Sequence, residues 1–369
     1  MNIDDKVRRV EETPVSQLAD VDIDDVYEHM DHLLRERPSP LALYDRWEAQ
    51  NWRVSDLDFT EDTQHWGFLM PELQDYLLTI FTEFFLGEQA VTDTLAPLII
   101  GAPDADSRVF LSTQIVDEAR HTVFFKRFFA EVLNVSGGLN AALAAVRPGA
   151  VEGWKKIFDV DLVEATDRVR LHPEDREAWV RGITVYHFVV EGMLALTGQK
   201  YLVRVFRNLG MLPGFRAGFT AVARDESRHV NYGVGAIREQ ILQNPKMADV
   251  VGDCVLGLLP SACKTIEPAD RNYENIQHPN DFPPPARIDP REIHRFSLTS
   301  LTKRLRVAGL SEEVCATIEA RGLTYYDDQI AEFETRFDRE HPARAFDRGE
   351  VELSFRRFEA HGVDDLGLP

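Results

Sequence analysis

The chain has 369 residues, 44% of them hydrophobic and 10% aromatic, which is enough for a large buried core. Lysine and arginine number 41 against 62 aspartates and glutamates, and the resulting net charge of −21 argues against nucleic acid as a partner. The three cysteines are too few and too scattered for a disulfide framework, which fits a reducing compartment. The N-terminus has no apolar signal segment, and no window approaches ~18 uncharged apolar residues, so we expect a cytoplasmic protein without a membrane span.

The predicted elements begin with a polar N-terminal arm, residues 1–66, which carries short helices and three tryptophans. The segment 71–100 is rich in apolar residues, has few breakers and opens with a proline, which suits a first helical turn. It predicts the first long helix. A second long helix is predicted over residues 108–133, antiparallel to the first because the connection between them is short.

Shorter helical pieces are expected over residues 138–173, and two further long helices over residues 174–210 and 213–243. Each of the four long helices has ~30 residues and therefore a length of ~45 Å at 1.5 Å per residue. The alternation typical of strands is absent from the sequence. We therefore predict an all-α fold, with a helical bundle over residues 67–265.

The composition changes after the bundle. Residues 266–290 contain three consecutive prolines, which do not fit inside a helix, so this segment is predicted to be a Pro-rich linker. Residues 291–369 are expected to form a partly helical C-terminal extension. Its charge-dense end is expected to be either mobile or a docking segment.

A pentapeptide of the form Asp-Glu-small-Arg-His occurs twice, each time inside a long predicted helix: DEARH from residue 117 and DESRH from residue 225. Residues three apart lie on the same face of a helix. Glu118 and His121 therefore present an oxygen and an imidazole nitrogen towards one point, and Glu226 and His229 do the same. A repeated pair of this kind indicates a metal site.

Each of the other two long helices is expected to add one glutamate. Glu191 lies in an apolar stretch, where an isolated carboxylate needs a counter-charge. On the first helix the candidates are Glu88 and, as a minor alternative, Glu83 on a different face. Two single glutamates and two Glu-x-x-His pairs form the ligand set of ferritin-like di-iron or di-manganese proteins, and these donors suit iron or manganese better than zinc. Asp117 and Asp225 are expected to accept the remaining imidazole N–H groups.

These motifs resemble those of the small, metal-containing subunit of class I ribonucleotide reductase and its relatives. The resemblance covers roughly residues 45–245. The residues that carry it are Trp52, SDLDFTED, Glu88, DEARH, Glu191 and DESRH. Within this superfamily, GEQAVT at residues 87–92 and Tyr186, five residues before Glu191, are similar to the ligand-binding oxidases related to the reductase subunit.

The resemblance implies a ferritin-like four-helix bundle core with additional helices. It implies a heterodinuclear Mn/Fe site, or one with two Fe, that activates dioxygen, a long-chain fatty acid or similar hydrophobic ligand held on the metals in an apolar tunnel, and a homodimer. One metal is expected to bind Glu88, Glu118 and His121, and the other Glu191, Glu226 and His229, with Glu118 as a candidate bridge.

The resemblance also implies a covalent link. In the related oxidases, a valine three residues after the first glutamate is joined through its β-carbon to the tyrosine oxygen, and the matching residues here are Val91 and Tyr186. Glu88 and Val91 share a helix face. Five residues are about 140° around a regular helix, so a local π-bulge is expected to help bring Tyr186 near Glu191.

The favoured hypothesis is a dioxygen-dependent oxidoreductase that performs two-electron C–H oxidation, on Val91 or on a bound hydrophobic substrate. One alternative is the radical-generating small subunit of class I ribonucleotide reductase. Many such subunits store a radical on a tyrosine four residues after the first histidine, where this chain has Phe125. The last tyrosines, Tyr325 and Tyr326, are also far from the C-terminus. The other alternative is a non-catalytic lipid- or metal-binding bundle.

Overall fold

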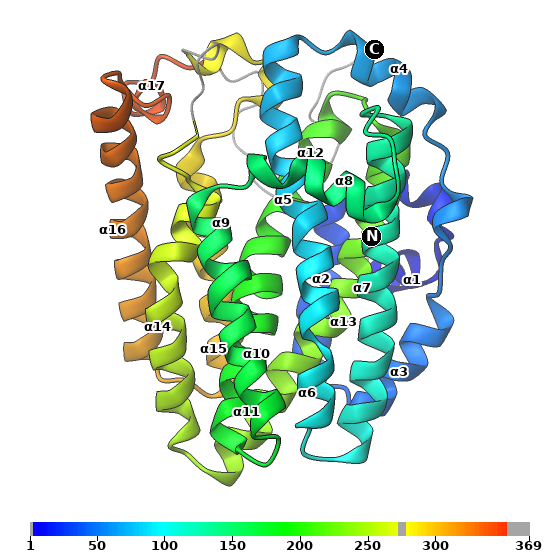
Figure 1. Cartoon of the computed structure of the whole chain (residues 1–369), viewed down its shortest axis with the longest axis vertical. Coiled ribbons are helices and arrows are strands. Elements are labelled where there is room, and N and C mark those ends of the chain that lie inside the picture. The colour runs from blue at the N-terminus through cyan, green and yellow to red at the C-terminus, as the bar shows by residue number, and fades with distance from the viewer. Residues whose placement is uncertain (1–2, 272–277, 353–369) are drawn as a thin grey trace.

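The computed structural model describes residues 3–271 and 278–352, and every regular element in these ranges is a helix (Figure 1). The predicted all-α class is therefore confirmed. Four long helical segments lie at the centre. They are α5 (Pro71–Thr94), α7 (Ala105–Glu131), a continuous segment made of α11 (Arg176–Ile183), η5 (Thr184–Ala195) and α12 (Leu196–Asn208), and α13 (Pro213–Gln243).

Local sequence fixes where these helices begin. Pro71 and Pro213 occupy the first turns of α5 and α13, where a missing backbone N–H costs nothing. The side chain of Asp104 caps α7 by accepting a hydrogen bond from the backbone N–H of Ser107 at 2.7 Å. The buried carboxylate of Asp62 accepts the backbone N–H groups of residues 214 and 215 at the start of α13, at 2.8 and 2.7 Å. It thereby ties α4 (Thr60–Phe68) to α13.

The third central segment is not a regular α-helix. Its middle part, η5, is a π-helix of 12 residues. The sequence suggested a local π-bulge near Tyr186, and the structure confirms it while extending it to more than two turns. The backbone hydrogen bonds of a π-helix join residues five apart, so Tyr186 and Glu191 lie closer to one side of the segment than they would in a regular α-helix.

Residues 3–66 fold into helices that cover α7 and α13. These are α1 (Ile3–Glu12), η1 (Val15–Asp20), α2 (Ile23–Glu36), α3 (Pro40–Ala49), η2 (Val54–Asp56) and α4. Apolar side chains such as Leu18, Val26 and Met30 are buried in the same core as those of the long helices. The N-terminal residues therefore extend the core of the bundle.

Short elements connect the second and third central segments, as predicted for residues 138–173. They are α8 (Leu139–Val146), η3 (Arg147–Gly149), α9 (Glu152–Lys156), η4 (Ile157–Asp161) and α10 (Leu162–Leu171), and α6 (Ala96–Ile100) precedes them between α5 and α7. After α13, α14 (Met247–Ile266) runs beside the bundle.

Between α14 and α15 (Pro290–Ala308), the described residues contain only two short 3-10 turns, η6 (Pro279–Asp281) and η7 (Pro284–Ala286). The extension is more helical than expected, because α15 and α16 (Glu312–Phe337) are long helices that pack against each other and against η5 and α14. The short α17 (Ala343–Asp347) follows near one end of the molecule (Figure 1). The end of the extension from residue 353 onwards, expected to be mobile or to dock, lies outside the described residues. Within the described ranges, no helix has the length and apolarity needed to cross a bilayer.

Candidate metal centre

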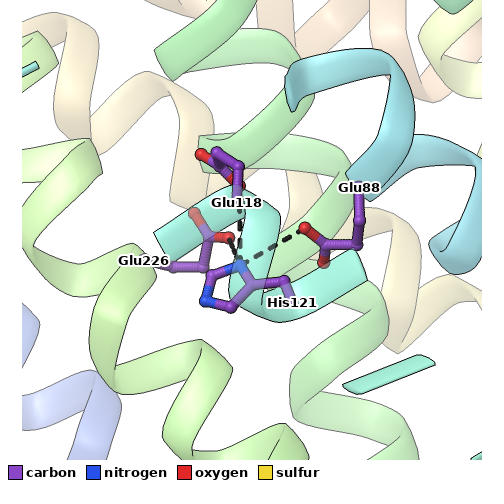
Figure 2. Close-up of side chains that lie close together, drawn as sticks. All are labelled: Glu88, Glu118, His121 and Glu226. Carbon is purple, nitrogen blue, oxygen red and sulfur yellow. Dashed lines mark hydrogen bonds and ion pairs between the residues drawn. The ribbon is translucent and has the colours of Figure 1, made fainter. Parts of the chain in front are cut away.

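All six residues predicted as metal ligands meet in the centre of the bundle. They come from four different helical segments and are buried, with at most 6% of their surface exposed. The six are Glu88 on α5, Glu118 and His121 on α7, Glu191 on η5, and Glu226 and His229 on α13. Figure 2 shows four of them pointing towards one another.

One group of side chains surrounds the Nδ1 atom of His121. This atom lies 3.3 Å from a carboxylate oxygen of Glu88, 3.5 Å from Glu118 and 3.7 Å from Glu226 (Figure 2). The four residues each offer one ligand atom, and these atoms lie within 4.8 Å of one another. Such a group has the donor types and the spacing to hold one metal ion.

A second group surrounds the Nδ1 atom of His229. It lies 3.4 Å from Glu118, 3.5 Å from Glu191 and 3.4 Å from Glu226. Glu118 belongs to both groups, and Glu226 contacts both imidazoles. Two adjacent positions that share a carboxylate match the geometry of a dinuclear site.

The electrostatics of the centre favour cations. Burial raises the pKa of Glu88 to about 7 and that of Glu191 well above its ordinary value, and burial together with the nearby charge of Glu118 raises the pKa of Glu226. In the described part of the chain, one oxygen each of Glu118, Glu191 and Glu226 is buried without a hydrogen-bond partner, as is Nδ1 of His229. Four carboxylates and two imidazoles of this kind fit two divalent ions of iron or manganese.

Nearby carboxylates also shift the pKa values of the two imidazoles. Burial opposes their protonation, but the charge of Glu88 near His121 and the hydrogen bond of His229 with Asp117 outweigh it, so the pKa of each imidazole rises well above its ordinary value. Imidazole binds a metal ion through a deprotonated nitrogen, so a metal ion at either position would compete with a proton for Nδ1.

The two predicted aspartates contact the outer imidazole nitrogens, but each aspartate contacts the histidine of the other pentapeptide. The Nε2 atom of His121 lies 3.2 Å from Asp225, and that of His229 lies 3.1 Å from Asp117. Carboxylates accept hydrogen bonds, so each Nε2 carries a proton and each Nδ1 faces the centre. Each pentapeptide thus supplies the aspartate that orients the histidine of the other.

The arginines of the two pentapeptides form ion pairs with both aspartates. Arg120 contacts Asp117 at 2.7 Å and Asp225 at 3.3 Å, and Arg228 contacts the same two aspartates at 3.0 and 2.6 Å. Burial opposes ionisation of Asp225, but the charge of Arg228 overcomes it and holds the pKa of Asp225 well below its usual range. The two buried aspartates are therefore neutralised by two arginines.

Two tryptophans from the N-terminal residues join this network. The indole N–H of Trp47 donates to Asp117 at 2.9 Å, and that of Trp52 donates to Asp225 at 2.8 Å. The guanidinium of Arg120 lies 5.4 Å from the ring centre of Trp52. The sequence offered no local signal for these contacts, because the tryptophans are 70 and 173 residues from their partners.

A glutamine and a histidine that the sequence analysis did not single out hold the other side of the centre. Gln114 donates to Glu191 at 2.8 Å and to Glu118 at 3.3 Å, and its carbonyl oxygen lies 3.0 Å from Nε2 of His187. Burial lowers the pKa of His187 to about 3, so the imidazole is neutral and donates from Nε2. The only available signal was that Gln114 precedes Glu118 by one helical turn.

The predicted pair Val91 and Tyr186 also meets. The phenol oxygen of Tyr186 lies 3.3 Å from the backbone oxygen of Val91 and 3.1 Å from Glu118. Burial raises the pKa of Tyr186 well above its ordinary value, so the phenol keeps its proton and donates it to Glu118. Glu83, by contrast, lies away from the centre and forms a 3.0 Å ion pair with Arg271.

A cavity of about 300 Å³ opens onto the centre, and its walls include Glu88, Glu118, Glu191 and Glu226. One wall is a stripe of α5 from Leu73 to Val91. These residues are 18 positions apart, so the wall runs for ~27 Å. The facing wall is formed by η5 and α12, and residues of the 279–290 segment and of α17 line the outer end. We call this cavity the slot; most of its lining is apolar.

Comparison with known proteins agrees with this architecture. Residues 35–256, more than half of the chain, match the family model for the ribonucleotide reductase small chain. Among solved structures, a valine-to-isoleucine variant of an R2-like ligand-binding oxidase with an anaerobically reconstituted Mn/Fe cofactor has 23% identity and a TM-score of 0.63, and a tyrosine-to-phenylalanine variant, reconstituted aerobically, has 22% and 0.63. Each match covers 74% of this chain and 93% of the other.

These likenesses confirm the expected ferritin-like core with additional helices, and the family match confirms the resemblance that the repeated motif suggested. The chain therefore belongs to the ribonucleotide reductase small-chain family and is an oxidoreductase of the dinuclear metal class.

Proposed function

We propose that the protein is a dioxygen-activating oxidase with a Mn/Fe or Fe/Fe carboxylate centre, which oxidises a C–H bond with the loss of two electrons. One observation carries the proposal: the two ligand groups share Glu118 and form the inner end of an apolar slot. A long-chain fatty acid or similar ligand in this slot would have its C–H bonds beside the metals. The R2-like ligand-binding oxidases with a Mn/Fe cofactor, which have the same fold, support this choice.

The residues that would hold the metals are those of the two groups, with Glu88, Glu118 and His121 for one ion and Glu191, Glu226 and His229 for the other. When bound, the metals supply the activation of dioxygen. The protein orients both imidazoles through the two aspartates and presents a mostly apolar slot on the side where the ligand would lie. Phe84 lines this slot with Phe125 packed behind it, and neither ring offers an easily oxidised group.

We also propose the cross-link between Val91 and Tyr186. A bond forms between the valine β-carbon and the phenol oxygen, while the C–H hydrogen of Val91 and the O–H hydrogen of Tyr186 are lost. The two electrons go to dioxygen. Glu118 supports this step, because it already accepts the phenol hydrogen bond at 3.1 Å and offers the proton a route away from Tyr186.

The proposed division of the chain puts the metal ligands in residues 67–265, with 266–290 as a linker and 291–369 as an extension.

The proposed assembly is a homodimer. It is supported by an open face of α7, on which Val109, Val116 and Val123 are 42–49% exposed and repeat every seven residues. A surface stripe of this kind is typical of a helix that packs against another helix.

The test is aerobic reconstitution of the metal-free protein with Mn(II) and Fe(II). We expect oxygen consumption, bound manganese and iron, and a loss of two hydrogen atoms in a peptide that joins Val91 to Tyr186. Tyr186→Phe is the matched control, because it keeps the metal ligands and lacks the oxygen that forms the link. Absence of both metals after reconstitution contradicts the oxidase proposal, and bound metals without oxygen consumption favour a non-catalytic bundle.

The second candidate is the radical-generating small subunit of ribonucleotide reductase, which the family match favours. Two observations stand against it. Phe125 occupies the position of the radical-storing tyrosine, and Tyr326, one of the last two tyrosines of the chain, is buried and stacks on His294 with 3.7 Å between ring centres. Co-purification with a large catalytic subunit, together with ribonucleotide reduction by the pair, would support this candidate.

A further inference from the structure

A phenylalanine reaches across the slot. Phe84 lies on α5, four residues and therefore ~6 Å before Glu88 along the helix axis. Its ring extends to the facing wall and touches the backbone of α12 at Gly198. A Cβ atom placed on Gly198 would lie 2.5 Å from the tip of the Phe84 ring and 2.7 Å from the neighbouring ring carbon. Both residues line the slot.

The ring is held from behind. Phe125 stacks on Phe84 with 6.0 Å between centroids and an interplanar angle of 5°, and Phe219 packs edge-on at 4.8 Å. Both of these phenylalanines are fully buried, while Phe84 itself is half-buried. The ring therefore has no room to withdraw into the core, and the space open to it is the slot.

This contact divides the slot along its length. On the inner side lie Glu88, Val91 and Glu191, where the metals would bind, and on the outer side the α5 wall continues through Leu77 to Leu73. A ligand that occupies both parts must pass beside the ring edge. Because a glycine forms the facing wall, the ring reaches the backbone itself, and the passage is confined to the space beside the ring edge.

We propose that Phe84 and Gly198 form a constriction that selects the ligand of the slot: a single unbranched hydrocarbon chain passes to the inner end, and a methyl-branched chain does not. The inference rests on the proposed function, because it names the class of hydrophobic ligand that function needs. One additional methyl group in a fitted apolar site changes affinity by roughly 10–200-fold. The same factor is expected between a straight and a branched chain here.

The test is a binding experiment on the full chain loaded anaerobically with Mn(II), so that no turnover occurs. Calorimetry compares hexadecanoic acid with phytanic acid, its methyl-branched relative. The wild type is expected to prefer the straight chain by roughly 10–200-fold, and Phe84→Ala is expected to remove the preference. Gly198→Ala is expected to weaken binding of the straight chain at least ~10-fold, because the new methyl group pushes the ring into the slot.

The double variant decides between a local and a general effect. In Phe84→Ala/Gly198→Ala the new methyl group meets no ring, so straight-chain binding is expected to return to the level of Phe84→Ala. Gly235→Ala on α13 is the matched control, since a Cβ there meets nothing within 4 Å. Mn(II) affinity is measured for every variant and is expected to stay unchanged, because the metal ligands are intact.

Three results would overturn the constriction: straight-chain binding by Gly198→Ala at the level of Gly235→Ala, a loss that persists in the double variant, or equal affinity of the wild type for both acids. Failure of all variants to bind either acid, with Mn(II) bound normally, would overturn the constriction and the hydrophobic ligand together. The metal and dioxygen parts of the proposed function are tested separately by reconstitution, so the two failures are distinguishable.

Discussion

The carboxylate of Glu88 gives a quantitative prediction for the metal-free protein. Burial raises its pKa from the ordinary value of 4.5 to about 7. The folded protein therefore holds this proton more tightly than the unfolded chain does. As the pH rises from about 4.5 to above 7, the folded state loses stability, and a shift of this size corresponds to ~3 kcal/mol. Glu88→Gln has no such proton to lose.

The free energy of unfolding of Glu88→Gln, relative to wild type, is therefore expected to increase by up to ~3 kcal/mol between pH 4.5 and pH 8. Urea denaturation in the presence of a chelator, followed by circular dichroism at several pH values, measures this difference. Glu61→Gln, at an exposed position on α4, controls for the chemical change itself. Its difference from wild type is expected to be small and independent of pH.

Added metal should reduce this stability difference between wild type and Glu88→Gln. A ligand present at 100 times its Kd stabilises the folded state by about 2.7 kcal/mol, and wild type binds metal with a carboxylate that Glu88→Gln lacks. Wild type is therefore expected to gain more from added Mn(II) at pH 8. A difference between Glu88→Gln and wild type that stays constant from pH 5 to pH 8 without metal would refute the reasoning from burial.

Two further predictions concern the aspartate network and the open face of α7. Asp225→Asn removes the negative charge that contacts both Arg228 and His121. We expect the free energy of unfolding in urea to fall by ~3–5 kcal/mol and the Mn(II) affinity, measured by titration, to weaken 10–100-fold. Unchanged values would show that the contacts of Asp225 contribute little to stability or to metal binding. Val116→Glu places a charge in the proposed dimer contact, so light scattering is expected to give a monomer whose stability stays within ~0.5 kcal/mol, and an intact dimer would exclude this face.

The sequence predicted those parts of the molecule that depend on patterns within one helix. Apolar spacing and proline gave the starts of α5 and α13, and the spacing of three residues gave each Glu-x-x-His pair. The placement of Tyr186 beside Glu191 could not be predicted from helix spacing alone. It depends on a π-helix whose extent the sequence does not reveal. A regular helix and a π-helix are compatible with the same apolar stretch, and packing selects between them.

Contacts between helices could not be predicted from the sequence, for a different reason. The sequence indicated that Asp117 and Asp225 would hold histidines, but not that each would hold the histidine of the other helix. Residues 104 positions apart meet only because α7 and α13 lie side by side at a particular register. The same holds for Trp52, whose partner is 173 residues away. Local periodicity carries no information about such distances along the chain.

The exchange of aspartates between the two pentapeptides limits how the centre can be taken apart. A designer who transplants α7 alone into another bundle moves Glu118 and His121 but leaves behind the carboxylate that orients this imidazole, which belongs to α13. The reverse transplant loses Asp117 in the same way. The smallest portable unit of this aspartate–histidine network is therefore both helices at their native register, together with Trp47 and Trp52. A complete metal centre also needs Glu88 of α5 and Glu191 of η5.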